Sequence, residues 1–156
     1  MAVVERADSP EIRIGDDRGD HVSIRVMGRM HPKADDYWDG NWLISPIEMA
    51  IGGFHGEVPA GLRMDELVRF REALETLHSS LQGEAVLDSM EGWIQLRVAV
   101  DRRGSVQVTG KALDQPGSAN ALTFTIDGLD QTHLPAVISA LGAAEARFPV
   151  RGQPDQ

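Results

Sequence analysis

The stretch Ile94–Val108 reads IQLRVAVDRRGSVQV and contains two runs in which apolar residues recur at every second position. Alternation with a period of two is typical of strands that bury one face. Only four residues, Asp101 to Gly104, separate the runs, and Gly104 can adopt the positive φ of a tight turn. A parallel pair would need a crossover connection of about a dozen residues or more. The stretch therefore predicts an antiparallel β-hairpin.

Strand-like alternation occurs in other parts of the chain as well. In residues 22–27, Val22, Ile24 and Val26 would point to one face of a strand. A similar pattern runs from Trp42 to Phe54, where Pro46 and the Gly52-Gly53 pair interrupt it. Another is formed by Leu122, Phe124 and Ile126. We interpret the glycines around Phe54, which are Gly52, Gly53 and Gly56, as a bulge or a bend in a strand. About seven strands are expected in all.

A helix is predicted between Met64 and Leu81, where apolar residues are spaced alternately by three and four positions. These apolar residues are Leu67, Phe70, Leu74, Leu77 and Leu81. Asp65 and Glu66 would interact favourably with the positive end of this helix, and Gly83 is the expected stop. The apolar side chains would form one stripe, which needs a sheet to cover.

A second helix is expected from about Thr132, as its N-cap, to a point before Pro149, with Pro135 in the first turn. The helices interrupt the strands rather than alternate with them. This order predicts an α+β fold, a mostly antiparallel β-sheet of about seven strands with two helices packed on one face. No linker divides the chain, so residues 1–156 are expected to form a single domain with loosely held tails at 1–10 and 150–156.

Composition narrows the possible functions. The chain has 156 residues and no Cys, which excludes disulfides, thiolate zinc sites and a Cys nucleophile. Its 24 acidic and 15 basic residues give a net charge of −9. This charge disfavours nucleic acid, because phosphate binding uses clustered Lys and Arg, and it favours a basic partner. We find no signal sequence and no apolar run of about 20 residues, so a cytoplasmic protein without membrane contact is expected.

Recognisable catalytic motifs are missing from the sequence. None of the five histidines belongs to a HExxH arrangement, and the chain has no GxSxG elbow, P-loop or GxGxxG fingerprint. We therefore expect no catalytic residues, no cofactor and no bound metal, and a protein that is not an enzyme. The alternative is a small metal-assisted hydrolase, in which His31 and one of Asp35, Asp36 or Asp39 would hold a divalent cation.

The most distinctive segment is DYWDGNWL at residues 36–43, which holds the only Tyr and two of the three Trp. One interpretation is a turn with its tip at residues 39–41, whose residue types permit positive φ, after which Trp42 enters the core. The other is an exposed patch, since aromatic side chains anchor interfaces and carboxylates accept hydrogen bonds from a partner's Arg and Lys. The candidate partner-binding residues are Asp35, Asp36, Tyr37, Trp38 and Asp39. The same aromatic side chains could instead form a self-interface in an oligomeric structural protein.

Several segments together resemble the WapI-type immunity proteins and related uncharacterised bacterial domains. They are DYWDGNWL at 36–43, DELVRFREALETL at 65–77, LQGEAVL at 81–87, IDGLDQTHLP at 126–135 and FPVRG at 148–152. The resemblance implies a cytoplasmic protein that binds and neutralises the C-terminal toxin domain of a contact-delivered polymorphic toxin, such as a nuclease acting on transfer RNA. It carries over no catalytic residues.

Overall fold

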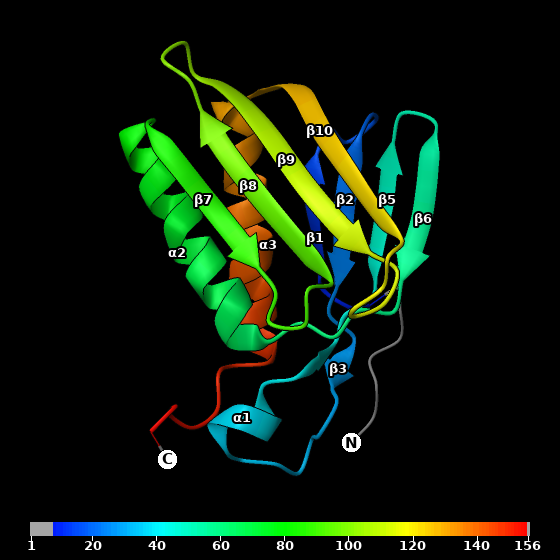
Figure 1. Ribbon diagram of the computed structural model, residues 1–156. Helices are drawn as coiled ribbons and strands as arrows, with labels where there is room; N and C mark the ends of the chain where they lie inside the picture. The colour runs from blue at the N-terminus through cyan, green and yellow to red at the C-terminus, as the bar shows by residue number, and fades with distance from the viewer. Residues whose placement is uncertain (1–7, 156) are drawn as a thin grey trace.

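The computed structural model describes residues 8–155, which form two four-stranded antiparallel sheets and a two-stranded ribbon (Figure 1). The first sheet has the order β1-β2-β5-β6, with bounds Glu11–Gly15, His21–Arg25, Ile47–Ile51 and Phe54–Val58. The second has the order β10-β9-β8-β7, with bounds Ala121–Asp130, Ser105–Leu113, Ile94–Val100 and Gly83–Asp88. The ribbon pairs β3 (Gly28–Arg29) with β4 (Leu43–Ile44).

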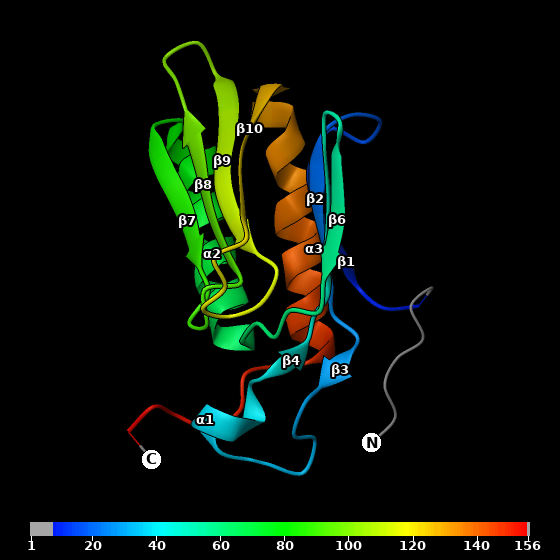
Figure 2. The ribbon, with the colours of Figure 1, turned by 45° about the vertical axis from the view of Figure 1, so that its right-hand side comes forward.

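Two long helices, α2 (Met64–Ser80) and α3 (Leu134–Arg147), pack together behind the second sheet. Figure 2 shows α3 standing between the second sheet and the first. The helix α2 also packs against β7, and α3 packs against β1. Buried apolar side chains from both sheets and both helices form one core cluster, so the helices join the two sheets. A short helix, α1 (Tyr37–Gly40), lies at the same end of the molecule as the C-terminal segment.

The structure confirms the α+β class and the antiparallel hairpin. Residues Ile94 to Val100 of β8 pair with β9 as predicted, and Gly104 has φ +81° in the turn. The strands are more numerous than the seven expected and are divided between two sheets and the ribbon. Part of the reason is β6, in which four of five residues are exposed, so that it shows no burial alternation. The pair Gly52-Gly53 forms the turn between β5 and β6 rather than a bulge, and Gly52 has φ +58°.

The helix α2 buries Leu67, Phe70, Leu74 and Leu77, as its spacing predicts. The prediction for the fifth residue of the stripe is wrong, because Leu81 is exposed and lies at the C-cap with φ +54°. Its N–H donates to the Leu77 carbonyl and closes the helix before Gly83, which instead begins β7. A left-handed C-cap is normally a glycine position, and here Leu81 occupies it.

The start of the second predicted helix differs in detail. A 3-10 turn, η1 (Gln131–His133), precedes α3, and the Asp130 carboxylate accepts the Thr132 N–H. Asp130 is therefore the N-cap of η1, and His133, rather than Thr132, is the N-cap of α3. Pro135 lies in the first turn of α3 and the helix ends at Arg147, both as predicted.

Candidate binding surface around α1

The segment DYWDGNWL forms a helical turn rather than the expected turn with a positive-φ tip. Asp36 is the N-cap of α1, and its Oδ2 accepts the Asp39 N–H at 3.0 Å. This contact explains the local structure, since Asp is among the preferred N-cap residues. Asn41 at the C-cap has φ −108°, and none of residues 39–41 adopts the positive φ that their types permit.

The structure places the candidate partner-binding residues together on and beside α1. The side chains of Asp35, Asp36, Trp38 and Asp39 are exposed, whereas Tyr37 is half-buried. The indole of Trp38 is 46% exposed, a high value for the largest apolar side chain. Trp42 is also half-buried and does not enter the core completely. An exposed Trp38 beside partly buried neighbours therefore combines the two interpretations of this segment.

The centre of the arrangement is Arg63, which precedes α2 and is only 1% exposed. Its guanidinium carbon lies 5.1 Å from the ring centroid of Tyr37, 5.3 Å from that of Trp38 and 4.9 Å from that of Trp42. A cation held over aromatic faces within about 6 Å is attracted by their quadrupoles, by about 2 kcal/mol or more when it is desolvated. One buried cation therefore organises all three aromatic residues of the segment.

Hydrogen bonds fix the same guanidinium to the backbone of α1. Arg63 donates from Nη1 to the Trp38 carbonyl at 2.6 Å and from Nη2 to the Tyr37 carbonyl at 2.7 Å. Its Nε donates to Asp65 Oδ1 at 3.0 Å, which balances the buried charge. The other oxygen of Asp65 accepts the Tyr37 hydroxyl at 2.9 Å and Arg69 Nη1 at 3.2 Å. Because α1 is only four residues long, these contacts, and not its own helical bonds, hold it in place.

Glu66 continues this network toward the second sheet. Its carboxylate accepts the Arg63 N–H at 2.9 Å and the Met90 N–H at 2.6 Å, in the turn between β7 and β8. Burial raises the pKa of Glu66, against the opposing effect of these two N–H donors. The sequence predicts Asp65 and Glu66 only as favourable charges at a helix start, yet their side chains also fasten two neighbouring segments.

The C-terminal segment holds the far side of α1. The fully buried Asn41 amide donates to the Tyr37 and Arg151 carbonyls, and its oxygen accepts the Arg151 N–H at 2.9 Å. The Arg151 side chain donates to the carbonyls of Pro32 and Ala34. Arg151, which belongs to the expected loose tail at 150–156, is thus tied to the C-cap of α1. Of the other expected tail, 1–10, residues 1–7 lie outside the described part of the chain.

Sequence reasoning missed Arg63, Glu66 and Asn41. The signal that could have identified Arg63 is a single cation inside the otherwise uncharged run VPAGLRM at residues 58–64. Buried Arg is rare unless it is paired, so its position would have required a carboxylate and further acceptors nearby. The identity of those acceptors depends on the fold.

The hydrolase alternative would join His31 with one of Asp35, Asp36 or Asp39 at a divalent cation. Within residues 8–155, no three His, Asp or Glu side chains are placed so that they could hold a metal ion together. His31, Asp35, Asp36 and Asp39 belong to this searched part of the chain.

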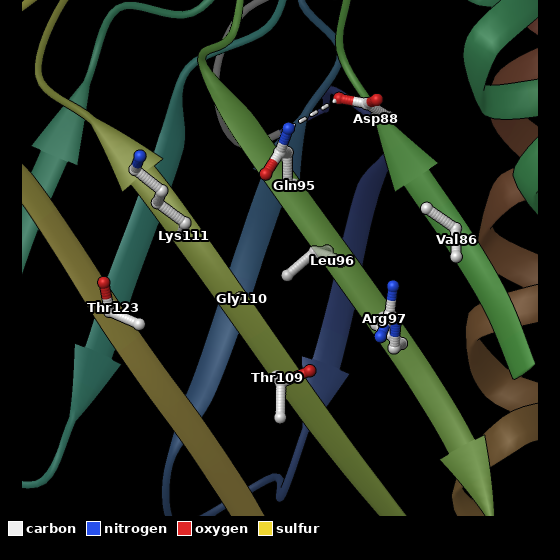
Figure 3. Close-up of a pocket in the computed structure, with 9 residues that line it drawn as sticks. All are labelled: Val86, Asp88, Gln95, Leu96, Arg97, Thr109, Gly110, Lys111 and Thr123. Atoms are coloured by element: carbon white, nitrogen blue, oxygen red, sulfur yellow. Dashed lines mark hydrogen bonds between the residues drawn. The ribbon is translucent and has the colours of Figure 1, made fainter.

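A second candidate is a shallow depression of about 360 Å³ on the outer face of the second sheet (Figure 3). Gly110 lies in the middle of it, and the side chains around it are mostly polar, with Val86 and Leu96 among them. Several are already engaged within the sheet: Gln95 donates to Asp88 at 3.1 Å, and Arg97 lies 3.4 Å from Glu84. The depression is open, so it resembles an ordinary solvated sheet face more than a site for chemistry.

The structure is therefore that of a small α+β protein whose most elaborate candidate site is a surface held in place by buried charges. Residues 13–149 match the model of the Immunity protein WapI-like family. The match covers most of the chain, and the protein belongs to this family. A search of curated proteins found no match. In residues 8–155 none of the helices combines the length and the apolar character that a membrane span requires.

Proposed function

We propose that this protein is a non-catalytic immunity protein that binds the toxin domain of a bacterial polymorphic toxin in the cytoplasm and covers its active face. The family supports the immunity role. The single observation that carries the choice of surface is Trp38, an exposed indole whose backbone is fixed by a buried Arg63.

A fixed, exposed indole suits binding for an energetic reason. Ordering a loop or a side chain at an interface costs free energy, and a preorganised anchor reduces this cost. The carbonyl of Trp38 is held at 2.6 Å by Arg63, and the ring of Trp38 meets Tyr37 edge to face with centroids 5.1 Å apart. Much of the indole position is therefore set before any partner arrives.

The charge of the chain favours a basic partner. The net charge is −9, and exposed Asp35, Asp36 and Asp39 surround Trp38 in the sequence. Negative potential around an anchor steers a positively charged partner and raises its association rate. A nuclease has such a face, because it must attract phosphates. Covering that face would exclude the nucleic acid, so the inhibitor would need no reaction of its own.

Co-expression with the toxin domain encoded next to this protein tests the proposal. We expect the intact protein to restore growth and to elute with the purified toxin domain as one complex. The variant Asp35→Lys/Asp39→Lys should associate more slowly at low salt. A matched control is Asp17→Lys/Glu72→Lys, which makes the same charge change at exposed positions outside the α1 segment. Failure of the intact protein to rescue growth would contradict the proposed function. Equal slowing of association by both pairs of substitutions would contradict the proposed binding surface.

A further inference from the structure

The exposed large apolar side chains are unevenly distributed over the described residues. Seven such side chains are exposed within residues 8–155. Four belong to segments at the α1 end of the molecule, namely Met30, Trp38, Met90 and Val150. The others are Phe54 in β6, Leu81 after α2 and Val86 in β7. Exposed apolar groups gathered in one region indicate an interaction surface, whereas scattered ones need no explanation.

Met90 is the most exposed of the four, at 58%, although hydrogen bonds hold the turn that carries it. The Gly92 N–H donates to the Ser89 carbonyl at 3.0 Å, and the Ser89 hydroxyl accepts the Ile94 N–H at 3.1 Å. The Met90 N–H itself donates to Glu66 at 2.6 Å. A loose turn therefore does not account for the exposure of Met90.

The anchor Trp38 and Met90 are held by the same few residues. Arg63 binds the Trp38 carbonyl, Glu66 binds the Met90 N–H, and Glu66 also accepts the Arg63 N–H. Arg63 and Glu66 are both buried at the start of α2. The two exposed side chains are thus attached through their backbones to one rigid base, which would preserve their relative position during binding.

The two side chains also have the same charged surroundings in the sequence. Trp38 has an acid two residues before it and another directly after it, in the run DYWD. Met90 has Asp88 and Glu91 in the same two places, in the run DSME. All four of these acids are exposed. An apolar group between carboxylates fits a partner pocket that is apolar inside and bordered by Lys or Arg.

We propose that Met90 is a second anchor of the interface that contains Trp38, and that both contact apolar pockets bordered by basic residues on the toxin domain. This inference rests on the proposed function, since the occupant is the same toxin domain. It extends the surface from α1 to the turn between β7 and β8, where sequence reasoning placed no contact. The unbranched thioether of Met90 can adapt to an irregular pocket.

The test is the affinity of the purified toxin domain, encoded next to this protein, for purified variants. Met90→Ala should weaken binding about tenfold, which corresponds to a loss of about 1.4 kcal/mol. Met90→Leu should stay within about threefold of the unmodified protein, because the apolar volume is similar. Val86→Ala is the matched control: Val86 is exposed on the sheet face, and we expect its affinity change to be less than about twofold.

The outcomes separate this inference from the proposed function. If Met90→Ala binds as tightly as the unmodified protein while the toxin domain is still neutralised, the second anchor is wrong and the immunity function stands. If the unmodified protein does not bind the toxin domain, both the second anchor and the proposed function are contradicted. Glu66→Ala adds a positional readout: we expect faster amide exchange at Met90 together with weaker binding, and unchanged affinity despite faster exchange would contradict a role for Glu66 in positioning the anchor.

Discussion

The α1 end and the outer face of the second sheet distribute polar and apolar groups in opposite ways. Along β8, polar side chains such as Gln95 and Arg97 point to solvent, and apolar ones such as Leu96 are buried. Around α1, Arg63 and Asp65 are buried and the indole of Trp38 is exposed. Lys, Arg, Asp and Glu are almost never fully buried unless they are paired, so the arrangement around α1 needs a reason. This contrast is the reason we propose α1, and not the depression on the sheet, as the surface that binds a partner.

The largest expected effect follows from removing the cation under α1. Arg63→Met should lower the free energy of unfolding by about 3–5 kcal/mol, because the buried Asp65 loses its main counter-charge and two carbonyls lose their donor. Urea denaturation measures this change. Arg69→Met is the control, since Arg69 contacts the same carboxylate but its side chain is 63% exposed, and it should cost less than about 1 kcal/mol. Equal losses would contradict a special role for Arg63.

The contact between α1 and the C-terminal segment gives the next largest effect. Asn41→Ala removes three hydrogen bonds made by a fully buried amide and leaves backbone groups without partners, at a cost of about 2–3 kcal/mol. Asn120→Ala removes an exposed contact to Asp114 and should cost less than about 1 kcal/mol. Thermal unfolding of the two variants compares them. Similar melting temperatures would indicate that the segment does not brace α1.

A change in the sheet should affect stability without affecting binding. A Cβ at Gly110 would lie 2.4 Å from Cζ of Phe124, so Gly110→Ala should destabilise the protein by about 1–3 kcal/mol through overpacking. At Gly56 a Cβ would meet nothing within 4 Å, which makes Gly56→Ala the control for a glycine in a strand. Affinity for the toxin domain should not change in the folded Gly110→Ala protein. A loss of affinity would indicate that the toxin domain contacts the second sheet.

The smallest expected effect is a pH dependence from Glu66. Because burial raises its pKa, the folded state binds this proton more tightly than the unfolded state does. Stability from this group is therefore greatest below the ordinary glutamate pKa and falls as the pH rises through the raised value. The unfolding free energy of the unmodified protein, relative to that of Glu66→Gln, should therefore fall as the pH rises from about 4 toward neutral. A free-energy difference that does not depend on pH would contradict a raised pKa of Glu66.

The parts of the fold predicted from the sequence are those set by neighbours in the chain. The β8–β9 hairpin and the helix α2 follow from local periodicity, and the α1 segment was identified by its aromatic and acidic composition. The division of strands between two sheets was not predicted, because pairing such as that of β2 with β5 depends on distant residues. Arg63 was missed for the same reason, since the carbonyls it binds lie 25 and 26 positions away.

Exposure alone does not define the proposed interface, and Phe54 allows this point to be tested. Its side chain is 67% exposed, more than Trp38 at 46%, but it lies in β6 and outside the α1 segment. Calorimetric titration of the toxin domain encoded beside this protein against Trp38→Ala and Phe54→Ala is the most direct measurement. We expect Trp38→Ala to weaken binding about 30-fold or more and Phe54→Ala to change it less than about twofold. Tight binding by Trp38→Ala would contradict the account, and still more so if Phe54→Ala bound weakly.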